Sequence, residues 1–413
     1  MRIVSGKAAE RIVRRLEQRG SRLDNVEPVV RKIIDAVKHD GDKALRRYAT
    51  TWDGLQRDQA LRLTPAEIET AWLETPKPIR AALRDAAANI RRFCRWQIPR
   101  EWVKRIEGGQ LGQLVRPLSS VGCYVPGGRY PLPSTLLMTV IPAQVAGVHR
   151  IVVVSPRPQP PTLAAAAMLG VTDVYRCGGA QAIAALAYGT TTIPRVDKIV
   201  GPGNAFVTAA KKLVSFDCSI DMLAGPTEAV VYNDDGTPEF LASDIVAQAE
   251  HDPDAVVVLI TAQPGVAKSA AQAVRAQCQL NLIARQAIRR GGYVLVAGSR
   301  EQAMDWVNRL APEHLTIAKR DLPHVQNAGS VFVGDYSPQS AGDYASGPNH
   351  VLPTGGAARF RGGLSVYDFV KIITVQHYNR RGLACIAGTV ATLADAEGLK
   401  AHAQSVRLRC PSA

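Results

Sequence analysis

Short runs of apolar residues alternate with helix-like segments along two stretches of the chain. In the first stretch, residues 118–227, a strand pattern begins at Val121, and further apolar strands are predicted at 151–154, 173–176 and 198–200. Helical segments follow these strands, at 134–146, 162–169, 178–188 and 205–214. Continuously apolar strands that alternate with helices are typical of a parallel sheet buried on both faces. We therefore predict an α/β domain over residues 118–227.

The same alternation begins again at residue 228. We predict strands at 228–232, 255–260, 293–296 and 314–317, with helices at 240–249, 266–289 and 301–310. Helical spacing of apolar residues also marks 26–48 and 65–96, and residues 102–115 are typical of strands around a turn at Glu107-Gly108-Gly109. We assign residues 25–117 and 228–373 together to one further α/β domain.

Both ends of the chain have patterns of their own. Residues 1–24 are predicted to form a short N-terminal helical arm. Residues 374–413 are predicted to form a C-terminal tail with helices at 384–393 and 395–409. A tail of this size is too short to bury a core of its own, so we expect it to pack on something else, such as a neighbouring subunit.

Composition is that of a soluble globular protein. Hydrophobic residues make up 46% of the 413 residues, and the mean hydropathy is −0.04. No apolar run reaches the roughly 18 residues of a membrane-spanning helix, and the first residues lack the pattern of a secretory leader. The seven cysteines include no Cys-x-x-Cys pair, so we expect reduced thiols and a cytoplasmic protein that binds no membrane.

The net charge of +14 is concentrated near the N-terminus. Residues 1–120 hold 25 Lys or Arg against 15 Asp or Glu. Such an excess is one mark of nucleic-acid-binding proteins, whose affinity falls steeply with salt. Here the arginines stand singly or in pairs among acidic residues with no interleaved aromatic residues. We therefore interpret them as a solvated basic face and expect no nucleic-acid partner.

Gln248 and His251 stand at the end of the predicted helix 240–249. Residues three apart in a helix share a face, so an amide oxygen and an imidazole nitrogen can converge on one cation. This pair would supply at most half of a metal site. Alone it is weak evidence for such a site, since the same pair also occurs on ordinary helix surfaces. The other half must come from later in the chain, where the candidates are Glu313-His314, Asp343 with His350, and Glu397 with His402.

Glu313 and His314 are neighbours at the start of a predicted strand. A histidine with a pKa near ~6.5 is suited to proton abstraction at neutral pH, and an adjacent carboxylate can activate a water molecule. The segment 340–350 that follows is dense in small and polar residues. Such segments carry function more often than packing.

Three glycine-containing turns follow strands in the domain 118–227. They are Tyr124-Val125-Pro126-Gly127-Gly128, Gly178-Gly179-Ala180-Gln181 and Gly201-Pro202-Gly203-Asn204. Turns of this kind meet at the carboxyl ends of a parallel sheet, where open α/β sheets bind ligands, although packing alone also requires tight turns. The dinucleotide fingerprint G-x-G-x-x-G is absent, because residue 206 is Phe.

In combination these motifs resemble the motif series of histidinol dehydrogenases, in the order and at the approximate spacing of that family. The resemblance extends from about residue 20 to residue 409. Its motifs are residues 201–204, Asp221 to Glu228, 248–251, 311–315, the loop from Gly342 to Thr354, and Glu397 to His402.

The resemblance implies two incomplete Rossmann-like domains in a domain-swapped homodimer that uses one zinc ion per site and NAD. The zinc ligands would be Gln248, His251 and Asp343, with His402 contributed by the other subunit. Glu313 and His314 correspond to the catalytic pair. Besides His314 and the zinc ligands, the substrate contacts would be Thr227, Tyr344, His350 and Glu397, and the NAD contacts would be Tyr124, Gln181 and Asn204.

The resemblance further implies oxidation of L-histidinol through L-histidinal to L-histidine, the last steps of histidine biosynthesis. No cysteine lies in these motifs, and Ser155 stands where some relatives carry one. A related enzyme that oxidises another alcohol, such as a sulfonated diol, is the main alternative, against which His350 and Glu397 argue. A zinc hydrolase is a weaker alternative, because the chain has no His-Glu-x-x-His.

Overall fold

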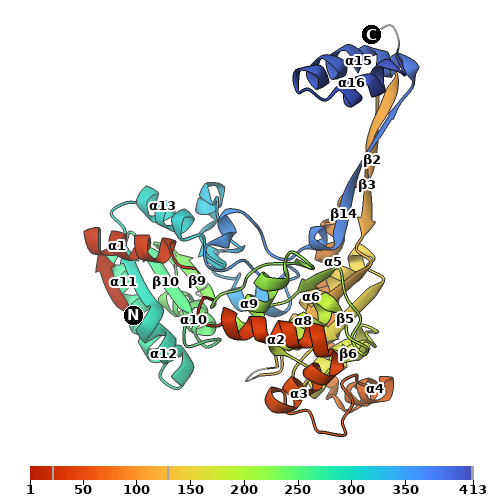
Figure 1. Ribbon diagram of the computed structural model, residues 1–413. Helices are drawn as coiled ribbons and strands as arrows, with labels where there is room; N and C mark the ends of the chain where they lie inside the picture. The colour runs from red at the N-terminus through yellow and green to blue at the C-terminus, as the bar shows by residue number, and fades with distance from the viewer. Residues whose placement is uncertain (21–22, 128–129, 411–413) are drawn as a thin grey trace.

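The computed structural model describes residues 1–20, 23–127 and 130–410. The largest sheet in the described residues has six parallel strands and lies on the left in Figure 1. Every neighbouring pair in this sheet is parallel. β9, one of the two central strands, and its neighbour β12 are buried along their whole length, as expected for parallel strands covered on both faces. In spatial order the strands are β1 (Arg2–Ser5), β11 (Gly292–Val296), β10 (Val256–Thr261), β9 (Glu228–Tyr232), β12 (His314–Ile317) and β13 (Ser330–Val333).

Helices cover both faces of the six-stranded sheet. One face packs on α10 (Pro238–Ala249), α11 (Pro264–Gln277) and α12 (Leu282–Gly291), and the other packs on α1 (Gly6–Glu17) and α13 (Arg300–Leu310). The single helix predicted at 266–289 is therefore wrong. It divides because the side chain of Asn281 accepts a hydrogen bond from the Ala284 N–H and begins a second helix.

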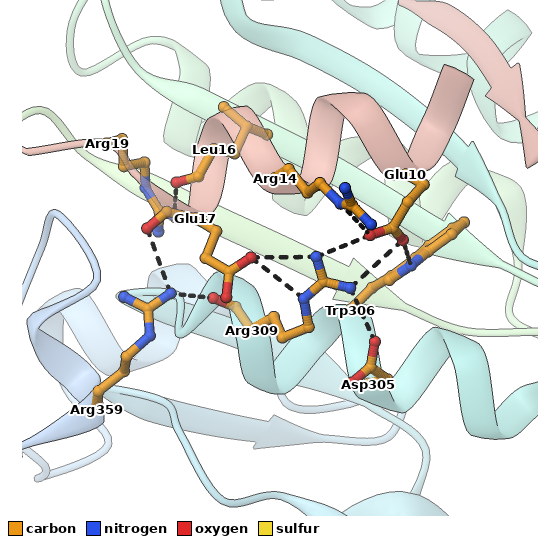
Figure 2. Close-up of polar contacts among 9 residues, drawn as sticks. All are labelled: Glu10, Arg14, Leu16, Glu17, Arg19, Asp305, Trp306, Arg309 and Arg359. Atoms are coloured by element: carbon orange, nitrogen blue, oxygen red, sulfur yellow. Dashed lines mark hydrogen bonds and ion pairs between the residues drawn. The ribbon is translucent and has the colours of Figure 1, made fainter. Parts of the chain in front are cut away.

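The N-terminal residues belong to this sheet, which corrects the prediction of a separate helical arm over 1–24. Strand β1 pairs with β11, and α1 packs on α13. Figure 2 shows the polar contacts that join the two helices. Arg309 of α13 donates to Glu10 at 2.9 Å and to Glu17 at 3.1 Å, and the indole of Trp306 donates to Glu10 at 3.0 Å.

We expect Arg309→Met to lower the free energy of unfolding by about 1 kcal/mol at pH 7, because the network is only partly buried. Hydrogen bonds from Arg309 lower the pKa of Glu10 from 4.5 to about 2, against the opposing effect of burial. The contribution of this carboxylate is therefore present above about pH 4.5 and is lost as the pH falls toward 2. Urea denaturation at about pH 7 and pH 3 checks this, and the difference between variant and wild type should shrink at the lower pH.

Arg11→Met is the matched control for that measurement. Arg11 is exposed on α1, next to Glu10 in the sequence, and forms no ion pair within the described residues. An equal loss of stability in both variants would contradict a specific role for the Arg309 network.

The second sheet has five parallel strands and lies in the residues predicted to form an α/β domain, 118–227. Its strands in spatial order are β6 (Val174–Tyr175), β5 (Arg150–Val154), β4 (Ser120–Tyr124), β7 (Lys198–Val200) and β8 (Ser219–Ile220). The connecting helices are α6 (Pro133–Ala146), α7 (Pro160–Met168), α8 (Gly179–Tyr188) and α9 (Ala205–Val214). These elements match the predicted series closely.

The N-terminal helices pack on the five-stranded sheet's helices, so the grouping of residues 25–117 with 228–373 is wrong. α2 (Glu27–Asp40) and α3 (Asp42–Trp52) contact α8, while α4 (Pro65–Glu74) contacts α7 and α5 (Lys77–Trp96) contacts α6. Their buried side chains share two apolar clusters with that sheet. Amphipathic spacing shows that a helix has a buried face but does not say which sheet covers that face.

A third, antiparallel sheet of three strands forms an arm that extends from the two parallel sheets (Figure 1). It contains the predicted hairpin β2 (Trp102–Ile106) and β3 (Gly109–Pro117), and β14 (Val370–Tyr378) pairs with β3. At the far end of the arm lie α15 (Arg380–Ala396) and α16 (Lys400–Arg407), the two helices predicted for the tail. The tail is therefore held away from both parallel sheets.

The remaining elements are short. They are α14 (Gln339–Tyr344) and three 3-10 helices, η1 (Lys319–His324), η2 (Ala357–Arg359) and η3 (Val366–Phe369). Within the described ranges, no helix combines the length and the apolar character that crossing a membrane requires.

Candidate active site

Glu313 and His314 lie at the amino-terminal end of β12, and both are buried. The Glu313 carboxylate accepts a hydrogen bond from the backbone N–H of Glu228 at 3.0 Å. The imidazole of His314 lies between two carboxylates, with Nε2 3.2 Å from Asp343 and Nδ1 3.8 Å from Glu313. His314 Nδ1 is buried and has no hydrogen-bond partner within the described residues. The adjacent pair therefore forms a buried acid–base group, as expected for the start of this strand.

Glu228 is a supporting residue that no sequence pattern marks for this role. Arg19 donates to both of its carboxylate oxygens, at 2.5 and 2.6 Å, and the backbone N–H of Gly355 donates to it at 3.0 Å. Buried bidentate pairs of this kind fix geometry as well as charge. The pair thus fixes the backbone N–H that binds Glu313.

Asp343 on α14 connects the candidate metal ligands to His314. Its Oδ2 atom accepts a hydrogen bond from Gln248 on α10 at 3.0 Å, while Oδ1 faces His314. α10 ends at Ala249, and His251 lies exposed in the turn that follows, so the prediction that Gln248 and His251 share a helical face is wrong in detail. The turn still keeps His251 close enough for its charge to act on Asp343.

Burial and charge set the protonation of this group. Burial raises the pKa of Glu313 to about 8, with His314 opposing the shift. Burial also disfavours the His314 cation, but the charges of Glu313 and Asp343 outweigh it and raise the pKa of the imidazole. For Asp343 burial again favours the neutral form, and the hydrogen bond and charge of His314 reverse this and lower its pKa. Such opposed shifts among touching groups are common at catalytic sites.

The predicted substrate contacts within the two sheets lie near this group. The His350 ring has Nδ1 2.8 Å from the carbonyl oxygen of Asp343 and Nε2 3.5 Å from the hydroxyl of Thr135 on α6. Burial lowers the pKa of His350, which keeps the ring neutral. Tyr344 is exposed next to Asp343, and Thr227 immediately precedes β9. The site therefore faces the helices of the five-stranded sheet.

Glu397 and His402 are not brought to this site within the chain. Both are exposed on the α15–α16 unit at the far end of the arm (Figure 1). Across the described residues, no three His, Cys, Asp or Glu side chains are grouped closely enough to hold a metal ion. The expected metal site is therefore incomplete in a single chain.

A cavity of about 590 Å³ opens at the carboxyl ends of β4, β6 and β7 in the five-stranded sheet. It is lined by Tyr124, Gln181 and Asn204 together with residues of all three glycine turns, so the prediction that these turns meet is confirmed. Gly128 of the first turn lies outside the described residues. Gly201 has φ of +114°, and a Cβ atom there would overlap the carbonyl oxygen of Tyr124, so this close approach requires glycine.

The hydrogen bonds in this cavity determine which atoms remain for a ligand. The Asn204 oxygen accepts from two N–H groups at the start of α9, which leaves its amide nitrogen free. The Tyr124 hydroxyl oxygen accepts from Gly179, which leaves its proton as a donor. Gln181 donates at 3.1 Å to Asp53, a buried carboxylate that also accepts from Gly178 at 2.9 Å. Nothing in the sequence singled out Asp53, because its partners are more than a hundred residues away.

Comparison with known proteins identifies the family of this chain. The family model described as histidinol dehydrogenase matches residues 16–410. The chain is 47% identical to a histidinol dehydrogenase of Methanothermobacter thermautotrophicus, over 94% of each chain, and 46% identical to one of Geobacter sulfurreducens, over 93% of each. A crystal structure of histidinol dehydrogenase from Elizabethkingia anophelis superposes with a TM-score of 0.94 at 36% identity, covering 100% of this chain and 98% of the other. The chain belongs to the histidinol dehydrogenase family.

Proposed function

We propose that this protein oxidises L-histidinol through L-histidinal to L-histidine, at the end of histidine biosynthesis, with NAD as the electron acceptor. The observation that carries the proposal is the buried Glu313–His314 pair, placed between the candidate metal ligands and the helices of the second sheet. The family match supports the choice of substrate.

The residues fit a zinc site that two subunits complete. Gln248, His251 and Asp343 offer an amide oxygen, an imidazole and a carboxylate from adjacent elements, and His402 would supply the fourth ligand from the other copy. This N/O donor set suits zinc. Bound zinc would orient the substrate, and NAD would accept a hydride in each of the two oxidations.

His314 is the base in the proposed chemistry. His314 takes the proton of the substrate hydroxyl as the first hydride leaves, and the contact of its Nε2 atom with Asp343 holds the ring on the side of the metal ligands. Nδ1 faces the Glu313 carboxylate, which stabilises the imidazolium that forms. His350, kept neutral by burial, would contact the polar part of the substrate.

Glu313 acts in the second oxidation. A raised pKa makes the ionised form of Glu313 a stronger base than an ordinary carboxylate, so in that form it can remove a proton from water as that water adds to the aldehyde. The hydrate then loses its proton to His314 and its second hydride to a second NAD. Two hydrides and one water thus account for the conversion of alcohol to carboxylate.

The cavity at the carboxyl ends of the second sheet is the proposed NAD site. Counted from β4, the strand order is 3-2-1-4-5, which is the Rossmann order without its sixth strand. Tyr124, Gln181 and Asn204 would contact the nucleotide with the hydroxyl proton, the amide oxygen and the amide nitrogen that their other hydrogen bonds leave free.

We expect Asp53→Ala to raise the KM for NAD about tenfold with little change in kcat. Gly178 and Gln181 both donate to the same oxygen of Asp53, so alanine removes the acceptor of both and releases the Gln181 side chain. Steady-state kinetics with NAD varied checks this. An unchanged KM, or an equal fall in kcat, would contradict a role at the nucleotide site.

We also propose a homodimer in which the arm of each chain reaches the active site of the other. Apolar side chains are exposed along the arm and its helices, including Val103, Ile372, Ile373, Leu393 and Leu399. Exposed apolar surface of this kind marks an interface.

We further propose a cytoplasmic location. It agrees with the seven cysteines, all of which are free thiols.

The test of the proposed function is NADH formation by zinc-loaded protein with limiting L-histidinol. We expect about two NADH per histidinol, because each alcohol-to-acid conversion releases two hydrides. Bound zinc without turnover of histidinol would contradict this substrate and direct the search to another small alcohol, such as a sulfonated diol.

A further inference from the structure

Three elements that carry the candidate site also carry a second set of buried polar residues. One helical turn before Gln248 on α10 lies Asp244, and one turn before Asp343 on α14 lies Gln339. Two residues after His314 on β12 lies Thr316, on the same face of the strand. We call Gln248, His314 and Asp343 the upper set and Asp244, Thr316 and Gln339 the lower set. Each of the three elements carries one residue of each set.

The members of the lower set bind one another across the three elements. The Thr316 hydroxyl donates to Asp244 at 3.0 Å and accepts from the Gln339 side-chain amide at 3.0 Å. The backbone N–H of Gln339 also donates to Asp244, at 3.3 Å. Gln248, Asp343 and His314 make two of these three links, since Asp343 of α14 joins Gln248 of α10 and His314 of β12. Two layers of hydrogen bonds therefore link α10, β12 and α14.

Burial makes the hydrogen bonds of the lower set costly to break. Asp244, Thr316 and Gln339 are 7%, 6% and 0% exposed. Gln339 Oε1 is buried without a hydrogen-bond partner among the described residues, which shows that the amide is oriented by Thr316 alone. A buried polar group keeps its partners because losing them leaves it unsatisfied, so small shifts between these elements are resisted.

We propose that Asp244, Thr316 and Gln339 are positioning residues that set the separation of Gln248, Asp343 and His314. The inference rests on the proposed function, because it concerns the zinc ligands and the base of that site. Thr316 is the central member, since its hydroxyl is the one group bonded to both other side chains. Residues behind metal ligands that fix their orientation commonly change metal affinity about 10- to 100-fold when replaced.

Thr316→Val tests the proposal, because valine keeps the shape of threonine and removes the hydroxyl. The chain offers a matched control in Thr261, which is fully buried in β10 of the same sheet and donates to Asp234 at 2.8 Å. Thr261 ends its strand at the carboxyl edge, whereas His314 begins β12 at the amino edge. Thr261→Val therefore loses a partly buried hydrogen bond from threonine to aspartate at the opposite edge of the sheet.

The readout is the zinc dissociation constant of the full-length protein, measured by competition with a chelating dye. We expect Thr316→Val to bind zinc about 10- to 100-fold more weakly, and Thr261→Val and the rescue variant Thr316→Ser to stay within about threefold of wild type. Equal zinc affinity in Thr316→Val and wild type would overturn the proposal, as would equal weakening in Thr261→Val. Zinc binding and histidinol turnover of the wild type are measured in parallel. If the wild type lacks either, the proposed function fails, and if it shows both while Thr316→Val binds zinc equally well, only the positioning proposal fails.

Discussion

A His314→Asn variant is expected to turn over L-histidinol at least about a thousandfold more slowly than wild type, with zinc still bound. Loss of a general base costs roughly 10²- to 10⁴-fold, and here the same imidazole serves both oxidations. Asparagine retains a side-chain amide for the hydrogen bond with Asp343, so the fold of the site should persist. The measurement is kcat from NADH formation, with the zinc content of both proteins determined.

A Glu313→Gln variant provides the contrast. Glutamine can still accept the N–H of Glu228 but cannot take a proton from water. The first hydride step should continue, so a single turnover should yield about one NADH per site before stalling. Rapid-mixing experiments distinguish the two variants. A burst of NADH from His314→Asn, or a complete absence of the first NADH from Glu313→Gln, would contradict the roles assigned to the pair.

The strands of both parallel sheets could be predicted because continuous Val and Ile runs are hard to reconcile with any exposed element. β5 and β10 are examples, each buried over most of its length within the predicted bounds. The packing partners of the amphipathic helices could not be predicted. α2 and α5 each show a clear apolar face, yet the sheet that each covers depends on contacts far away in sequence.

The candidate site likewise has residues that the sequence could predict and residues that it could not. Glu313, His314 and Asp343 were identifiable because they lie in short motifs, and the structure brings them together. Arg19 and Glu228 are 209 residues apart, and Asp244 and Thr316 are 72 apart, so neither pair leaves a local pattern. Long-range hydrogen bonds between common polar residues have no periodicity or spacing by which sequence could reveal them.

Mixing two inactive variants, His402→Asn and Glu313→Gln, is expected to restore about a quarter of wild-type activity after subunit exchange. Half of the dimers formed by random exchange contain one chain of each kind. In such a dimer, one site receives both defects and the other receives none, provided that His402 acts in the neighbouring subunit. The measurement is NADH formation from L-histidinol, compared with each variant carried through the same exchange alone.

The chain offers a matched control for this mixture, because Glu397 and His402 lie on the same arm. A mixture of Glu397→Gln and His402→Asn gives every site one defective arm, so no activity should return. Recovery in the first mixture but not in the second would require that arm and base come from different chains. If neither mixture recovers, His402 must act within its own chain, which would require the arm to leave the extended position seen in Figure 1.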